Sequence, residues 1–147
     1  MNDFEDRIIE AFRSTRRVGR FDTSSVALES MNQRCGDKVM LFLLQDALGK
    51  ISDARFEARG CVLSRAAVSI VCEAIIGLDR EIAVAWANSM ISSVSLKKED
   101  MSMSAELKAG HLLDAQNLIN SVLHIPLRIE CALLPWRAVA KWHKVEV

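Results

Sequence analysis

The sequence lacks a net charge, a long apolar run and any internal repeat. Its 147 residues include 19 basic and 19 acidic side chains, so the formal net charge is zero. Proteins that bind nucleic acid usually carry a basic excess, and we therefore expect no nucleic-acid partner. No stretch reaches the roughly 18 consecutive apolar residues of a membrane-spanning helix. We accordingly expect no membrane partner.

The N-terminal segment, residues 1–7, is acidic and amphipathic and does not have the pattern of a signal peptide. We therefore expect a cytoplasmic protein. In that compartment the four cysteines are more typical of metal ligands or core residues than of disulfides. Half of the residues are hydrophobic, and the length suits one globular domain. We expect a single domain over residues 1–147.

Hydrophobic periodicity predicts an α+β fold: a small, mostly antiparallel three-stranded sheet with helices packed on one face. A weak strand is expected near residues 26–28. Two stronger strands should form a hairpin around a turn at Gly49. The expected strands of the hairpin are 38–45 and 51–59, and the expected helices are 4–17, 62–76, 79–91, 112–123 and 127–144.

Three cysteines and one aspartate are candidates for a metal site. Cys35 and Asp37 lie two residues apart, and side chains at such positions point to the same side of an extended segment. The predicted hairpin ends near them and continues through Gly60 into Cys61. With Cys131 these residues offer three sulfurs and one oxygen, a set that suits zinc or sulfur-bound iron. Spacing alone leaves open that the cysteines are buried apolar residues.

The remaining cysteine and the histidines do not extend this set. Cys72 lies on the same predicted helix as Cys61, about 16 Å further along, and is expected in the core. His111, His124 and His143 lack ligand spacing to one another. We expect them at surface or half-buried positions.

Three motifs occur in an order that resembles a known family. Residues 32–37, Asn-Gln-Arg-Cys-Gly-Asp, resemble the Asn-Pro-x-Cys-Gly-Asp motif of the iron–sulfur scaffold family that contains IscU, SufU and the N-terminal domain of NifU. Residues 53–64, which end in Gly-Cys-Val-Leu-Ser, resemble its second motif. Residues 126–136, which contain Glu-Cys-Ala-Leu-Leu-Pro-Trp, resemble its third.

The long interval between Cys61 and Cys131 favours the SufU branch, and residues 92–110 resemble the insertion that distinguishes SufU from IscU. The histidine that precedes the last cysteine in IscU is absent here. Two positions depart from the family: Gln33 replaces the usual proline, and Glu130 replaces the histidine of IscU or the lysine usual in SufU.

The resemblance implies that Cys35, Asp37, Cys61 and Cys131 bind zinc. It also implies that the protein takes persulfide sulfur from a PLP-dependent cysteine desulfurase of the SufS type, as a zinc-dependent sulfurtransferase would. PLP would belong to that partner. Because Cys35 is expected on a loop beside Gly36, it is the expected sulfur acceptor. Whether the protein is an enzyme stays open.

Two alternatives remain. The same four residues could hold a [2Fe–2S] cluster on a scaffold that works with other iron–sulfur assembly proteins. The protein could also be a zinc module without sulfur chemistry. Asp37 argues against the zinc module, because structural zinc sites are usually closed by cysteine and histidine.

Overall fold

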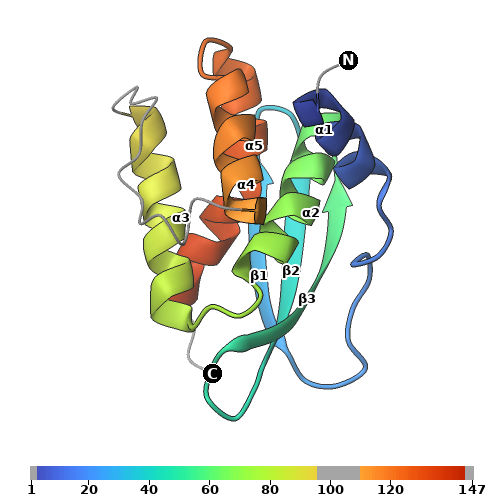
Figure 1. Ribbon diagram of the computed structural model, residues 1–147, viewed down its shortest axis with the longest axis vertical. Helices are drawn as coiled ribbons and strands as arrows, with labels where there is room; N and C mark the ends of the chain where they lie inside the picture. The colour runs from blue at the N-terminus through green and yellow to red at the C-terminus, as the bar shows by residue number, and fades with distance from the viewer. Residues whose placement is uncertain (1–2, 96–109, 145–147) are drawn as a thin grey trace.

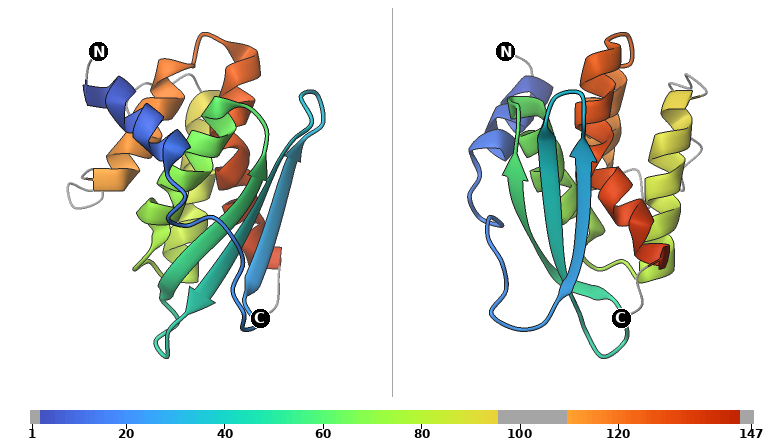
Figure 2. Two further views of the ribbon diagram at one scale, coloured as in Figure 1. Left: turned by 90° about the vertical axis from the view of Figure 1, so that its right-hand side faces the viewer. Right: turned by 180° about the vertical axis from the view of Figure 1, so that it is seen from behind.

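Three antiparallel strands form one sheet in the order β1-β2-β3, and the helices cover one of its faces (Figure 1). The computed structural model describes residues 3–95 and 110–144. Seen from behind, the opposite face of the sheet is covered by none of the described helices (Figure 2). The elements in chain order are α1 (Asp3–Arg13), β1 (Val26–Asn32), β2 (Asp37–Gln45), β3 (Ile51–Arg59), α2 (Val62–Ile75), α3 (Arg80–Ser95), α4 (Gly110–Ser121), α5 (Pro126–Ala140) and the 3-10 helix η2 (Lys141–Lys144).

The alternation of apolar and polar residues gives the sheet its buried face. In β3, Ala54 and Phe56 are buried, whereas Arg55 is only half-buried and Glu57 is exposed. The register pairs Leu41 with both Leu28 and Phe56, which places an apolar row under the helices. The weak strand expected at residues 26–28 is the start of the longer strand β1. The predicted fold class is thus confirmed.

Strand pairing also fixes which loops share an end of the molecule. Asp37 pairs with Asn32 of β1, and its neighbour Lys38 pairs with Arg59 of β3. The β1–β2 turn, the start of α2 and the start of α5 therefore lie at one end, and the β2–β3 turn lies at the other (Figure 1). The expectation that the chain leaves the hairpin beside residues 35–37 is confirmed. We call this the site end.

Helices α2 and α5 form the middle of the helical layer. Ten of the fourteen residues of α2 are buried, as its nearly continuous apolar sequence predicts. Cys72 is fully buried within it, and burial raises the pKa of its thiol. The prediction that Cys72 is a core residue is confirmed. Helix α5 starts at Pro126, where the missing N–H costs no helical hydrogen bond.

One sequence-based expectation about a helix end is wrong. Helix α1 ends at Arg13 and not near residue 17, because the following segment pairs with β3: Phe56 N–H donates to the carbonyl of Arg17. At the start of α3, Asp79 caps the helix, because its carboxylate accepts the backbone N–H of Ile82 at 2.9 Å.

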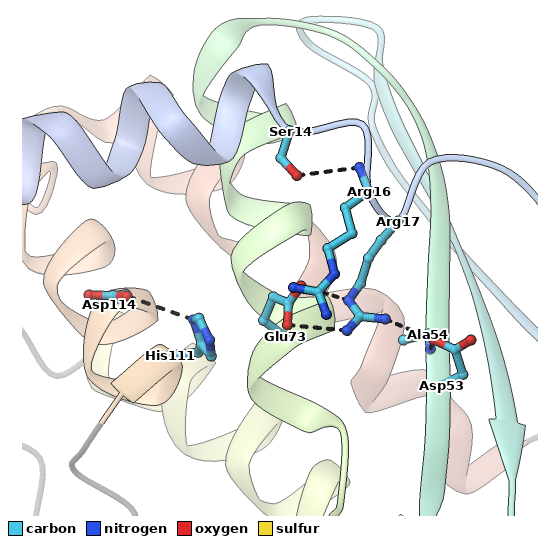
Figure 3. Close-up of polar contacts among 8 residues, drawn as sticks. All are labelled: Ser14, Arg16, Arg17, Asp53, Ala54, Glu73, His111 and Asp114. Atoms are coloured by element: carbon cyan, nitrogen blue, oxygen red, sulfur yellow. Dashed lines mark hydrogen bonds and ion pairs between the residues drawn. The ribbon is translucent and has the colours of Figure 1, made fainter.

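Arg17 ties this N-terminal segment to α2 and β3 (Figure 3). Its guanidinium donates to Glu73 at 2.7 and 3.3 Å and to Asp53 at 2.8 Å. The side chains of Arg17 and Glu73 are only 15% and 23% exposed. The hydrogen bond from Arg17 holds the pKa of Glu73 below its ordinary value, although burial opposes this shift.

Most of the predicted insertion, residues 96–109, lies outside the described residues. In the part of the chain that the structure describes, no helix combines the length and apolar character needed to cross a bilayer.

We predict that Glu73→Gln lowers the free energy of unfolding by roughly 1–2 kcal/mol at neutral pH, because Arg17 loses a charged, half-buried partner. Because the folded-state pKa of Glu73 is lowered, this stabilisation exists above the ordinary glutamate pKa and is lost as the pH falls through the folded value. Urea unfolding at neutral and acidic pH measures both effects. Glu57→Gln, which breaks the exposed pair with Arg20, is the control and should change stability by less than about 0.5 kcal/mol. Equal losses in the two variants would contradict the prediction.

Candidate metal centre

Three potential metal ligands meet at the site end: Asp37, Cys61 and Cys131. One carboxylate oxygen and two Sγ atoms lie within 4.8 Å of one another. Within residues 3–95 and 110–144, no other group of three or more His, Cys, Asp or Glu side chains is as close. The sequence analysis predicted all three residues as ligands, and the fold brings them together.

Each of the three residues comes from a different element. Asp37 is the first residue of β2 and is only 5% exposed. Cys61 occupies the N-cap position of α2, with extended backbone angles. Cys131 lies on the buried side of α5 and is 2% exposed. The centre therefore forms only where the sheet, α2 and α5 are packed together.

Ser64 connects the carboxylate to the thiols. Its hydroxyl donates to Asp37 Oδ2 at 2.8 Å, and its Oγ lies 3.4 Å from Cys61 Sγ. The Cys131 thiol donates to the same Asp37 oxygen at 3.5 Å. A buried hydrogen-bond network of this kind orients potential ligands before a metal binds. Sequence reasoning assigned Ser64 no role, although a position three residues after Cys61 lies on the same side of a helix.

Gly60 leaves the space that Asp37 occupies. A Cβ atom at this position would lie 2.6 Å from Asp37 Cγ and 2.9 Å from Ser64 Oγ. The glycine also has φ +152°, which residues with side chains rarely adopt. Any side chain at position 60 would therefore displace the carboxylate or the serine. The motif contains this glycine, but its contact with Asp37 has no signal in the sequence.

The two thiols of the group differ in proton affinity. Burial opposes ionisation of Cys61, but hydrogen bonds with Ser64, with the Cys131 side chain and with the backbone of Leu63 together outweigh it, so the pKa of Cys61 lies below its ordinary value. Burial raises the pKa of Cys131 to about 12, and its contacts with Cys61 and Asp37 add to the increase. Without a metal, Cys61 is thus the more easily ionised thiol.

Cys35 lies apart from this group. Residues 33–36 form a turn in which Gly36 N–H donates to the carbonyl of Asn32 at 2.8 Å and Gly36 has φ +74°. The expectation that Cys35 and Asp37 point to one side of an extended segment is therefore wrong. Cys35 is exposed on this turn, two residues before Asp37. Of the four predicted ligands, the structure gathers three and leaves Cys35 at the surface.

The histidines contribute no side chain to the group. His111, His124 and His143 are all exposed, which agrees with the expectation of surface positions. The remaining predicted ligand, Cys35, lies on the turn that directly precedes Asp37.

The sequence profile of the NifU-like N terminal domain family matches residues 3–117. The chain belongs to this family. It is 30% identical to the iron–sulfur cluster assembly scaffold protein IscU of Thermotoga maritima, over 92% of this chain and 89% of that protein. It is 31% identical to the zinc-dependent sulfurtransferase SufU of Bacillus subtilis, over 91% of this chain and 84% of that protein. The predicted family resemblance is confirmed, and relatives of both branches match.

Solved structures show the same fold. The candidate SUF-system iron–sulfur cluster assembly scaffold protein of Fervidobacterium islandicum superposes with a TM-score of 0.73 and 28% identity, covering 95% of this chain and 93% of that one. A NifU-like N-terminal protein of Brucella abortus superposes with a TM-score of 0.75 at 22% identity, over 94% and 90% of the chains. The latter likeness supports the fold alone.

We predict that Gly60→Ala weakens metal binding at this candidate centre by roughly tenfold or more, because the added methyl group displaces Asp37 from the two thiols. Titration against a competing zinc chelator measures the affinity. Gly49→Ala is the matched control: Gly49 also has a positive φ of +83°, but nothing lies within 4 Å of its added Cβ. Both variants should lose stability through backbone strain, and only Gly60→Ala should lose affinity. Equal affinities would contradict the contact-based explanation.

Proposed function

We propose that the protein is a zinc-dependent sulfur acceptor in iron–sulfur cluster assembly. The observation that carries this proposal is the arrangement of the four predicted residues. Asp37, Cys61 and Cys131 lie together in a mostly buried group, and Cys35 is exposed on the adjoining turn. The membership in the NifU-like family and the likeness to SufU support the assignment.

The residues present fit a zinc ion. Two sulfurs and a carboxylate oxygen are already close, and Cys35 would supply a third sulfur to complete a tetrahedral set. Zinc would keep the coordinated thiols deprotonated and moderate their reactivity. A carboxylate is a harder ligand than sulfur for such a site. We infer that Asp37 makes the centre exchangeable, unlike a closed structural zinc site.

The exposure of Cys35 supports it as the reacting residue. Its thiolate would attack the terminal sulfur of a cysteine persulfide on a PLP-dependent desulfurase of the SufS type. A new S–S bond forms to Cys35, the S–S bond of the donor breaks, and the electron pair leaves on the donor cysteine. The sulfur is transferred without net oxidation. Cys61 and Cys131 are less suited, because they are half-buried and buried, respectively.

A second candidate function is a scaffold for a [2Fe–2S] cluster. The identity to IscU of Thermotoga maritima favours it, and three thiols with one carboxylate can also hold iron. In this case the cluster is cargo that is assembled on the four residues and passed to other iron–sulfur assembly proteins. Cys35 would then serve only as a ligand and not as a sulfur acceptor.

We predict that Cys35→Ser folds but neither accepts sulfur nor accelerates the desulfurase, because the exposed thiol is lost and the buried group is kept. Sulfide release by the desulfurase, together with mass spectrometry of the peptides, measures both properties. Cys72→Ala is the control: it removes a thiol that is fully buried in the core, and it should accept sulfur as the wild type does. Extra sulfur on the Cys61 or Cys131 peptide of the wild type would contradict the role of Cys35.

We predict that Asp37→Ala separates the two functions. If the protein is a sulfur acceptor, loss of the carboxylate weakens zinc binding and lowers stimulation of the desulfurase. If it is a scaffold, loss of the oxygen ligand slows cluster release. Anaerobic reconstitution with iron and sulfide then distinguishes them by the visible absorption of a stable cluster. A stable cluster on the variant would favour the scaffold and contradict the proposed acceptor.

A further inference from the structure

A cavity of about 430 Å³ lies between α1, α2 and α4. This volume is within the range of small-molecule binding sites. No residue that lines the cavity belongs to the candidate metal centre, so an inference about it is independent of the proposed function. The charged side chains of the lining come from α1, the segment after it, α2 and α4: Arg7, Glu10, Arg16, Glu73, His111 and Asp114.

Glu73 is already engaged inside the fold, and this leaves Arg16 available. Arg17 donates to both oxygens of the Glu73 carboxylate, at 2.7 and 3.3 Å. The Arg16 guanidinium is 4.0 Å from the same carboxylate and 74% exposed, and this distance is too long for a hydrogen bond. In Figure 3 the two guanidinium groups lie to one side of Glu73, and His111 of α4 lies to the other. Among the residues that the structure describes, none accepts a hydrogen bond from the Arg16 guanidinium.

Two carboxylates of the lining also keep unused acceptors. Arg7 donates to Oδ1 of Asp114 at 2.6 Å, whereas Oδ2 has only the His111 ring nearby, at 3.9 Å. That distance exceeds a hydrogen bond, so both the ring and Oδ2 can bind another group. The Glu10 carboxylate is exposed and has no hydrogen bond or ion pair with a residue of the ranges 3–95 and 110–144.

The available groups of the cavity are therefore of both signs. A ligand with negative charge alone would face the carboxylates of Glu10, Glu73 and Asp114, and a ligand with positive charge alone would face Arg7 and Arg16. These side chains do not form a metal site either, because the one group of three close potential ligands in the described part of the chain is at the site end. A molecule that carries an ammonium and a carboxylate suits both sets.

We propose that this cavity binds a free, neutral amino acid with an apolar side chain. The ligand carboxylate accepts hydrogen bonds from the planar fork of Arg16 and from the His111 ring. The ligand ammonium group has three donors, and it donates to Glu10 and to the unused oxygen of Asp114. Neither half of the ligand alone satisfies both the donors and the acceptors.

The remaining lining selects the kind of amino acid. Ala11 and Ile70 line the cavity beside the charged groups, and they offer contacts to an apolar side chain. The three carboxylates of the lining are matched in number by Arg7, Arg16 and the Arg17 that holds Glu73. A side chain with its own charge would add an unmatched charge to this balanced set, so a neutral amino acid fits best.

Binding of L-leucine to the purified protein tests the proposal. Its NMR chemical shifts should saturate with a Kd of about 1 mM or less, and the shifted residues should be those of the cavity on α1, α2 and α4. Two analogues each lack one charge: isocaproate is leucine without the ammonium group, and isoamylamine is leucine without the carboxylate. Each should bind at least about tenfold more weakly than L-leucine. L-glutamate and L-lysine should also bind more weakly.

Substitutions assign the two charges of the ligand. Arg16→Gln should raise the Kd of L-leucine about tenfold and remove its preference over isoamylamine. Arg13→Gln is the matched control, because Arg13 is also exposed in the last turn of α1 but does not line the cavity. It should leave the Kd within about twofold. Glu10→Gln should instead remove the preference over isocaproate. All three positions are exposed, so the variants should fold.

Three outcomes would overturn the amino-acid site. They are the absence of saturable shifts with L-leucine, equal binding of L-leucine and either one-charge analogue, and equal Kd values for Arg16→Gln and Arg13→Gln. Saturable shifts confined to the site end would also overturn it, because the ligand would then occupy the metal centre. None of these results bears on sulfur transfer to Cys35, so the proposed function stands or fails separately.

Discussion

The register between β2 and β3 is the constraint on which the site depends. It places Lys38 opposite Arg59, so the first residue of β2 lies beside the glycine through which the chain enters α2. Asp37 and Cys61 are thereby brought together by backbone pairing before any metal is involved. A shift of one residue would turn Asp37 to the other face of the sheet. The buried apolar row of the hairpin resists such a shift, and the core of the protein therefore determines the geometry of its polar centre.

Local patterns were sufficient for most of the fold. The strict alternation in β3, the glycine turn at residue 49 and the apolar length of α2 predicted those elements and the shared end of the hairpin. The predictions failed where contacts between distant segments determine the local structure. The pairing of Arg17 and Gly19 with Phe56 ends α1 early. The turn at Gly36 means that Cys35 and Asp37 do not belong to one extended segment. The pairing of Arg17 and Gly19 has no signal in the neighbouring residues, whereas Gly36 indicates a turn without fixing where the Cys35 side chain lies.

The candidate site was predicted as a set of residues but not as an arrangement. Motif resemblance supplied the four candidate ligands, and the structure divides them into a mostly buried group of three and one exposed thiol. Two contacts between different elements were not predicted: the hydrogen bond from Ser64 to Asp37 and the close approach of Asp37 to Gly60. These contacts join residues that are 27 and 23 positions apart, so no local spacing reveals them.

The position of Cys131 has a consequence for the synthesis of the protein. This thiol contacts an aspartate that lies 94 residues earlier in the chain. When the ribosome has made the chain only as far as α4, the nascent polypeptide contains Cys35, Asp37 and Cys61 but not α5, which carries Cys131. The centre can close only after α5 has been translated and has folded against the sheet. Complete coordination of a metal in this geometry would therefore be a late event in synthesis.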